Sequence, residues 1–341
     1  MPSKKALTWT LSITLAVIWV FAFTLQPASA QQKTSIKILG SKFGRTTYIQ
    51  AFALAQIMNK NSKWLKGTAQ ETMGSADNIK LADRSPEVKK STILVTSATT
   101  YGFARAAGRG FDKKYDDLRM IAITLRAGHF FASLDPKIKT YKDVKGKKVA
   151  IGLGRSPHGV EGRRTIEDAW EYKDKQSVKI IQMPAPSIAE ALVDRIVDVG
   201  FMTINPAKPV WMPDTSLESL RSRHKVYPIA LTEELAKRGN SKGKYDFFPL
   251  VTMPADTLYK GSPETSMACG FIGFAAYTSV PDDIVYETLR ILYEHQPKFV
   301  AYHNLMKVII PDKLGEGPFK EEELHPGAVK FYKERGLKIG L

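Results

Sequence analysis

The sequence contains very little cysteine and no long apolar run beyond its first thirty residues. Cys269 is the only cysteine among 341 residues, which excludes a disulfide within the chain and a zinc site built on cysteines. After residue 30, no stretch stays apolar for the roughly 18 residues that a membrane-spanning helix needs. The part of the chain that follows residue 30 is therefore expected to be soluble.

The patterns of the common catalytic and metal sites are also missing. No pair among the six histidines has the H-E-x-x-H spacing of a zinc enzyme. No G-x-S-x-G motif surrounds Ser156, the serine beside His158, and two residues of one loop rarely face each other as nucleophile and base. We find no repeat of fixed period and no low-complexity tract. We therefore expect no metal, no cofactor and no enzymatic activity.

Acidic side chains are outnumbered by basic ones, 34 Asp and Glu against 50 Lys and Arg, which gives a formal net charge of +16. This balance suits an acidic ligand or a negatively charged surface, although a solvated surface that keeps the protein soluble explains it equally well. The lysines are spread along the chain rather than clustered, so nucleic acid is not an expected partner.

The first thirty residues have the organisation of a secretory signal peptide. Lys4 and Lys5 precede the apolar run 6–25, and Ala28-Ser29-Ala30 forms an A-x-A cleavage site. The alternative is a retained membrane anchor, but Pro27 and the small residues favour cleavage after Ala30. We expect a periplasmic protein whose 311 remaining residues suffice for two lobes.

Apolar segments of strand length alternate with segments of helical periodicity along the rest of the chain. This alternation predicts an α/β fold with parallel sheets covered by helices. The expected strands are 36–39, 91–95, 118–125, 129–134, 148–151, 177–182, 197–202, 226–231 and 270–277. The expected helices include 47–58, a stretch ending at 107, 157–172, 187–196, 282–293 and one that begins at His325.

Several of these strands end in loops rich in glycine, serine and threonine. The clearest is Gly40–Tyr48, where backbone N–H groups at a helix N-terminus would form a seat for an anion. An ordinary tight turn is the alternative for each loop. The loop 152–159 begins like a dinucleotide fingerprint, but Pro157 replaces the third glycine, so a nucleotide is not expected. Arg163 and Arg164 follow this loop, and a solvated helix face is their preferred interpretation over bidentate anion binding.

These segments resemble the TAXI-type extracytoplasmic receptors of TRAP transporters over essentially the whole length after residue 30. The most specific match is the closing Leu324-His-Pro-Gly-Ala-Val-Lys-Phe-Tyr332, taken together with Asp143-Val-Lys-Gly-Lys-Lys-Val-Ala-Ile-Gly152. Further matches are Gly44–Tyr48, Gly74-Ser-Ala-Asp-Asn-Ile-Lys80, Val95–Tyr101, Gly152–Ser156 with Arg163-Arg164, Asp198–Thr203 and Val280–Tyr286.

The resemblance implies a two-lobed type II periplasmic-binding-protein fold, with parallel-rich sheets flanked by helices and crossover strands between the lobes. Lobe 1 would comprise residues 31–125 plus 272–341, and lobe 2 residues 126–271. The ligand would be a small organic anion of the carboxylate, amino-acid or oxo-acid type, held in the cleft between the lobes. The partner would be a TAXI-type TRAP membrane subunit with fused small and large subunits. A periplasmic sensor that signals without transport has nearly the same sequence features.

Carried over by resemblance, the ligand-binding candidates lie on loops of both lobes. They are Ser41, Gly44, Thr46, Thr47, Tyr48, Gly74, Ser75, Asn78, Ser97, Thr99, Ser156, His158 and Thr203.

Three of these loops depart from the family pattern. Lys42 and Arg45 stand in a loop that usually carries glycine pairs, and Ala98 stands where the family has an acid. In the fourth loop, Pro157 and His158 stand where glycine and threonine are usual. Lys42 and Arg45 are therefore the specificity candidates. Since an acid is missing, we predict an anionic ligand, with a preference that differs from glutamate.

Overall fold

The computed structural model describes residues 33–341 except 44, 109, 155, 207–210 and 243–248. Ser35–Leu341 form one compact unit. The predicted signal peptide and its cleavage site lie outside the described residues. In the described part of the chain, no helix is both long enough and apolar enough to cross a membrane.

The strands form one mixed sheet whose path runs β2-β1-β3-β11-β4-β7-β5-β6. Strands β8, β9 and β10 pair with β7, β4 and β11, respectively, beside this path. The bounds are β1 Thr34–Leu39, β2 Leu65–Gln70, β3 Thr92–Ser97, β4 Leu118–Ser133, β5 Lys148–Ile151, β6 Lys179–Gln182, β7 Val199–Asn205, β8 Met212–Pro213, β9 Tyr227–Ile229, β10 Leu250–Met253 and β11 Thr265–Tyr277.

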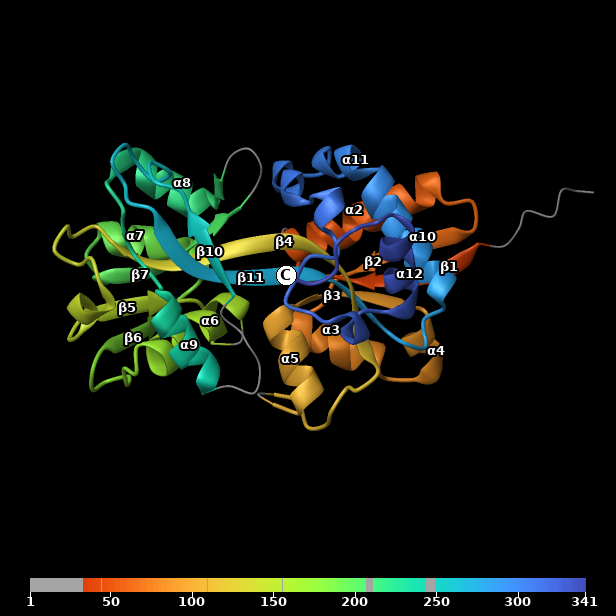
Figure 1. Cartoon of the computed structure of the whole chain (residues 1–341), viewed down its shortest axis with the longest axis horizontal. Helices are drawn as coiled ribbons and strands as arrows, with labels where there is room; N and C mark the ends of the chain where they lie inside the picture. Colours follow the sequence, from red (N-terminus) through yellow and green to blue (C-terminus); the bar gives the residue numbers. More distant parts are fainter. Residues whose placement is uncertain (1–32, 44, 109, 155, 207–210, 243–248) are drawn as a thin grey trace, which may run out of the picture. The chain divides into compact units, whose positions relative to one another are not determined.

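Two long antiparallel strands, β4 and β11, connect the outer parts of this sheet. β1 pairs with β3, and β5 with both β6 and β7, in parallel. β11 runs antiparallel to β3 and β4, and β4 antiparallel to β7. Figure 1 shows β4 and β11 side by side between the strands β1–β3 and the strands β5–β7. The α/β class predicted from the alternation is confirmed, with parallel pairing in the two outer parts of the sheet.

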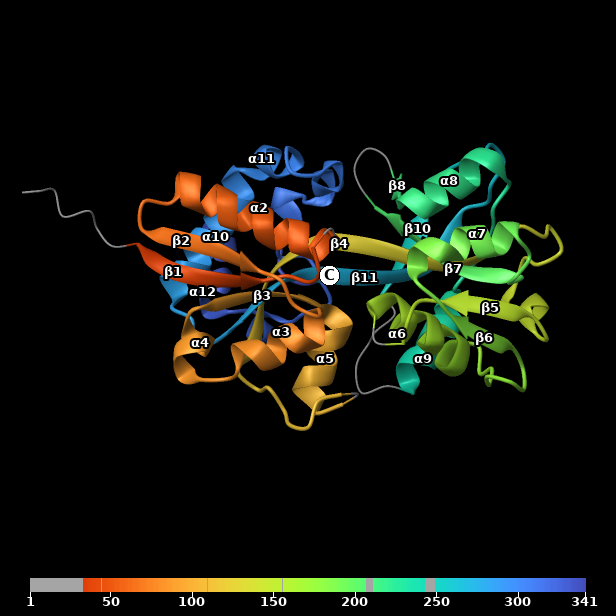
Figure 2. The ribbon, with the colours of Figure 1, turned by 180° about the vertical axis from the view of Figure 1, so that it is seen from behind.

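Helices cover the sheet. They are α2 Thr46–Asn61, α3 Ser75–Ala82, α4 Pro86–Lys90, α5 Ala98–Ala106, α6 Pro157–Arg164, α7 Ile188–Val193, α8 Thr215–Arg223, α9 Glu233–Ser241, α10 Asp282–Glu294, α11 Gln296–Val300 and α12 Pro326–Glu334. Helix α2 lies along one side of β1–β3, and α3 and α5 lie along the other (Figures 1 and 2). As predicted, His325 begins the last helix, because its side chain accepts a hydrogen bond from Gly327 N at 3.2 Å.

The two separate strands expected at 118–125 and 129–134 are wrong, because both belong to the single 16-residue strand β4. The polar Arg126 and the glycine Gly128 interrupt the apolar pattern, but both pair with β11, so the strand continues through them. Close packing of β4 on β11 also explains why residue 273 is a glycine. A Cβ atom at Gly273 would lie 1.8 Å from the carbonyl oxygen of Ala122.

Two further expectations about helices and strands need correction. The helix expected over 157–172 ends as α6 at Arg164 and continues as a π-helical turn, Thr165–Ala169. Strand β2 and helix α9 were not expected at all. The apolar pattern of β2 is short because one of its buried positions is Gly67, which has no side chain. A glycine is needed there, since a Cβ atom would lie 2.9 Å from Ala55 Cα.

Buried side chains gather in three main clusters. One draws its members from residues 36–123 and 269–332. The other two draw theirs from residues 130–268 and lie on different elements of that part of the chain. Both parts of the chain therefore bury their own apolar side chains, which fits two lobes joined by β4 and β11.

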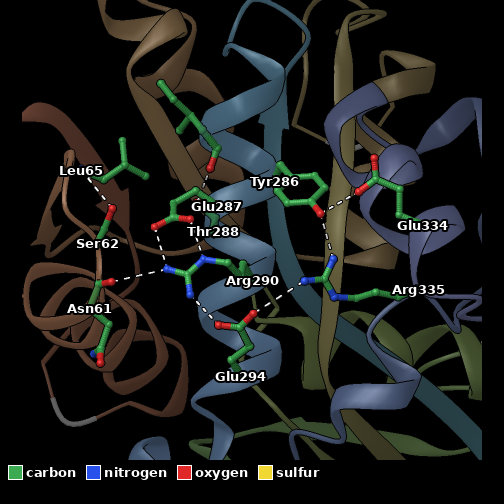
Figure 3. A network of polar contacts seen from close by, with 11 residues as sticks. Asn61, Ser62, Leu65, Tyr286, Glu287, Thr288, Arg290, Glu294, Glu334 and Arg335 are labelled. Atoms are coloured by element: carbon green, nitrogen blue, oxygen red, sulfur yellow. Dashed lines mark hydrogen bonds and ion pairs between the residues drawn. The ribbon is translucent and has the colours of Figure 1, made fainter.

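A network of charged side chains ties α10 to its neighbours, as Figure 3 shows. Arg290 lies between Glu287, at 2.7 Å, and Glu294, at 2.5 Å, and its Nη2 donates to the carbonyl oxygen of Asn61 at the end of α2. Arg335, the C-cap residue of α12, contacts Glu294 at 3.6 Å and donates to the hydroxyl of Tyr286 at 2.9 Å. This network fixes the outer face of α10 against α2 and α12.

Candidate functional site

The first predicted loop brings Ser41 and Thr47 together at the start of α2. Their hydroxyl oxygens lie 2.5 Å apart, and the turn is tight, since a Cβ atom at Gly40 would lie 2.9 Å from Tyr48 Cα. Arg45 occupies the N-cap position of α2 without a side-chain cap, so the first turn of this helix keeps its N–H groups for another acceptor. Thr46 begins that turn. Gly44 lies outside the described residues.

The two specificity candidates, Lys42 and Arg45, are exposed beside this turn. Phe43 between them is 79% exposed, and its ring contacts Tyr48 with centroids 5.6 Å apart. Tyr48 stacks in turn on Phe52, with centroids 6.2 Å apart. The surface at the start of α2 is therefore both cationic and aromatic.

Asn78 connects the first three loops. Its Nδ2 donates to the carbonyl oxygens of Gly40, at 2.7 Å, and Val95, at 2.8 Å. Its Oδ1 accepts a hydrogen bond from Thr72 at 2.6 Å. With both amide hydrogens used and the side chain fully buried, Asn78 positions the ends of β1 and β3. Its predicted direct contact with a ligand stays a prediction.

The second loop ends at Gly74, whose φ of 122° is the positive region that favours glycine. Gly74 is the N-cap of α3 and Ser75 begins this helix. Asp77 reaches back, and its Oδ2 accepts from Met73 N at 3.1 Å.

The third loop reaches the second part of the chain. Ser97 caps α5 by accepting from Thr100 N at 3.1 Å. Thr99, on the first turn of α5, donates a hydrogen bond to Glu161 Oε1 on α6 at 3.3 Å. Thr99 and Glu161 are each 6% exposed. A residue of the first predicted lobe therefore contacts a residue of the second.

Glu161 is also bound by His129 on β4. The His129 Nδ1 contacts Glu161 Oε2, and both side chains are buried. A glycine makes room for the carboxylate, because a Cβ atom at Gly270 on β11 would lie 3.2 and 3.3 Å from its two oxygens. Neither Glu161 nor His129 was selected from the sequence. No motif surrounds them, and the folded chain alone brings α5, α6, β4 and β11 together.

This arrangement affects the prediction, based on Ala98, that the ligand differs from glutamate. The third loop itself carries Ala98 in place of an acid, but the carboxylate of Glu161 lies next to Thr99. The acid comes from the other part of the chain. A preference against ligands with an ammonium group therefore no longer follows from Ala98.

His158 lies in the first turn of α6, and its ring packs against the sheet. Its ring contacts Phe201 and His129, with centroid distances of 4.8 and 5.6 Å. Burial, and secondarily the neighbouring His129, lowers the pKa of His158 to about 3, so the imidazole is neutral at physiological pH. Ser156 uses its hydroxyl to cap α6, accepting from Gly159 N at 3.1 Å. The ligand contacts predicted for Ser156 and His158 remain predictions.

The paired arginines after this loop are bound within their own helix. Arg163 contacts Glu167 at 2.7 Å, and Arg164 contacts Asp168 at 3.0 Å. Arg164 is only 3% exposed, so the solvated helix face expected for it is wrong. Thr203, the last predicted contact, lies on β7 opposite His129 in the strand register.

A cavity of about 860 Å³ adjoins this cluster. Thr99 and Gly102 of α5, Gly270 and Phe271 of β11, and Phe319 and Leu341 near the C-terminus are among its lining residues. Of the predicted ligand contacts, the lining includes Thr99. Its volume suits a small organic molecule. Among the residues that the structure describes, no group of three or more His, Cys, Asp or Glu side chains could hold a metal ion.

Comparison with known proteins gives a family and several structures of similar fold. A family model described as the NMT1-like family matches residues 38–336. MatC from Rhodopseudomonas palustris, solved with bound malate, is 13% identical, with coverage of 89% of this chain and 95% of that chain and a TM-score of 0.48.

A TctC solute binding protein from Polaromonas is 14% identical, with coverage of 80% and 86% of the two chains and a TM-score of 0.47. The periplasmic aliphatic sulphonate binding protein SsuA from Escherichia coli is 13% identical, with coverage of 90% and 94% and a TM-score of 0.42.

Proposed function

Because this chain belongs to the NMT1-like family, we propose that it is an exported solute receptor of the TAXI type. It binds a small organic anion between two lobes and delivers it to an ion-coupled TRAP membrane transporter. The lobes are those expected from the sequence, 31–125 plus 272–341 and 126–271, with β4 and β11 as the crossover strands.

The observation that carries this proposal is the hydrogen bond between Thr99 and Glu161. It joins the first turn of α5 to α6, two elements whose apolar neighbours belong to different buried clusters. A predicted ligand contact, Thr99, is thereby brought next to an acid from a distant part of the chain. A receptor that closes over its ligand needs such contacts across the cleft, because they stabilise the closed state.

The charges at the start of α2 support an anionic ligand. Lys42 and Arg45 are exposed beside the uncapped first turn of α2, where a carboxylate would find both positive charge and free N–H groups. Asn78 holds the three loops of this part in place. The binding surface is therefore largely preformed, which lowers the entropic cost of binding.

Titration calorimetry on residues 31–341 with small mono- and dicarboxylates tests the proposal. We expect one-to-one binding of at least one acid, lost in a Lys42→Glu, Arg45→Glu double variant that remains folded. Export and transport are tested separately, by uptake of the identified acid in a strain that lacks the gene. Unchanged uptake would favour a sensor over a transport receptor.

A further inference from the structure

Glu161 is a buried carboxylate with acceptor capacity to spare. Its two oxygens contact His129 Nδ1 and Thr99 Oγ1, the latter at 3.3 Å. An ionised carboxylate can accept about four hydrogen bonds, so these two contacts leave room for further donors. A buried carboxyl group needs hydrogen-bond partners, because leaving polar atoms unsatisfied away from water is costly.

Among the described residues of α6, the two arginines do not supply them. Arg163 and Arg164, two and three residues further along α6, bind Glu167 and Asp168. His158, which contacts His129 in the same cluster, is neutral because burial lowers its pKa to about 3. The surroundings of Glu161 therefore favour an added hydrogen-bond donor or positive charge, and disfavour a second acceptor.

A ligand has a route to this carboxylate. Thr99, which donates to Glu161, and Gly270, whose position lies against both carboxylate oxygens, are both part of the lining of the 860 Å³ cavity. The Glu161 carboxylate lies directly behind these two lining residues, and its oxygens can accept a ligand donor in addition to Thr99. Gly270 contributes no side chain that could block the approach.

We propose that Glu161, oriented by His129, is a specificity-determining residue that accepts a hydrogen bond from the ligand. This inference rests on the proposed function. It narrows the ligand to an acid that carries a donor group, such as a 2-amino or 2-hydroxy acid. A 2-oxo acid of the same skeleton places an acceptor against the carboxylate and is bound more weakly.

Two matched sets of acids test this inference by calorimetry on the mature protein. One set is L-aspartate, L-malate and oxaloacetate, and the other is L-glutamate, L-2-hydroxyglutarate and 2-oxoglutarate. Within each set only the group on C2 differs. We expect the amino or hydroxy acid to bind at least about tenfold more tightly than the oxo acid, since an unpaired buried polar group is left in the oxo complex.

Two variants separate a role in recognition from a role in folding. Glu161→Gln keeps the size of the side chain and removes its charge, and should reduce the preference for the donor-bearing acid to less than about threefold. Glu167→Gln changes a partly exposed acid that is paired with Arg163; it is the matched control and should retain the preference. Thermal unfolding shows whether each variant is folded. If Glu161→Gln does not fold, Thr99→Val tests the same site by removing the hydroxyl that contacts Glu161.

The outcomes are distinct. Equal binding of the three acids of a set, or tighter binding of the oxo acid, overturns the role of Glu161 and leaves the proposed function standing. Binding of none of the six acids also contradicts this inference, and the proposed function is then judged by the wider carboxylate panel. A preference that persists unchanged in Glu161→Gln overturns it as well.

Discussion

Thr99 on α5 donates a hydrogen bond over 3.3 Å to Glu161 on α6, although 62 residues separate them in the sequence. The bond lies where β4 and β11 connect the two outer parts of the sheet, and His129 holds the same carboxylate from β4. Two elements that would move apart in an open receptor are thus joined by one side-chain contact.

Replacing Thr99 by valine tests this contact. The variant keeps the shape of the side chain and removes the donor, which should weaken the closed state by about 1 kcal/mol. We expect about fivefold weaker ligand binding and a larger radius of gyration of the unliganded protein in small-angle X-ray scattering. Thr278→Val, at an exposed threonine, is the control. An unchanged affinity and radius would contradict a role in closure.

Lys42 and Arg45 provide a second test, because both are exposed beside the first turn of α2. Reversing either charge, with Lys42→Glu or Arg45→Glu, should weaken binding of a carboxylate about threefold to tenfold at low salt. The effect should shrink as salt screens the charges. Lys60→Glu, at the other end of the same helix, changes the net charge equally and should have little effect. Equal losses in all three variants would indicate a general charge effect instead.

Asn78 is expected to matter for both stability and binding. Asn78→Ala leaves the carbonyl oxygens of Gly40 and Val95 and the hydroxyl of Thr72 without their buried partner. We expect a loss of about 2–3 kcal/mol in the free energy of unfolding, measured with urea. Asn78→Asp should lose about as much because it removes both donors, whereas the exposed Asn304→Ala should lose almost nothing. A neutral Asn78→Ala would show that these hydrogen bonds do not fix the loops.

The low pKa of His158 predicts a specific pH dependence. Burial lowers the pKa to about 3 in the folded protein, whereas the unfolded chain has an ordinary value near 6.5, so the unfolded state binds the proton more readily between these limits. The contribution of His158 to stability is therefore largest above pH 6.5 and falls as the pH decreases toward 3. Between pH 7.5 and 5, the contribution of His158 should fall by about 2 kcal/mol.

The variant His158→Phe isolates this contribution, because phenylalanine fills the space beside Phe201 without titrating. The groups that face His158, namely His129 and the Glu161 bound to it, remain in the variant. Urea unfolding at the two pH values should therefore show a smaller loss of stability in the variant than in the native protein. Equal losses would mean that the pKa of His158 is not lowered in the folded state.

The sequence predicts the elements whose signals are local. The strand over 148–151 and the helix that begins at His325 follow from apolar runs and from a capping residue beside Pro326, and both are confirmed. The loops at Gly40–Tyr48 and Val95–Tyr101 are likewise marked by glycine and hydroxyl residues at strand ends. Such features depend on neighbours within a few positions, which a single sequence displays.

The pair of Glu161 and His129 could not be found in this way. Glu161 stands within a helix beside two arginines, where it has the appearance of an ordinary surface acid, and His129 lies in an apolar strand. Their contact depends on the register of β4 with β11 and on the glycine at 270, which leaves space for the carboxylate. Long-range register is not encoded in local periodicity, so the sequence alone predicts that this loop lacks an acid.

Native mass spectrometry of residues 31–341 in the presence of a mixture of small amino, hydroxy and oxo acids tests the central claim most directly. The account predicts a one-to-one complex with a single small carboxylate, formed from the folded protein and lost on denaturation. Detection of the free protein alone across the whole mixture would contradict it.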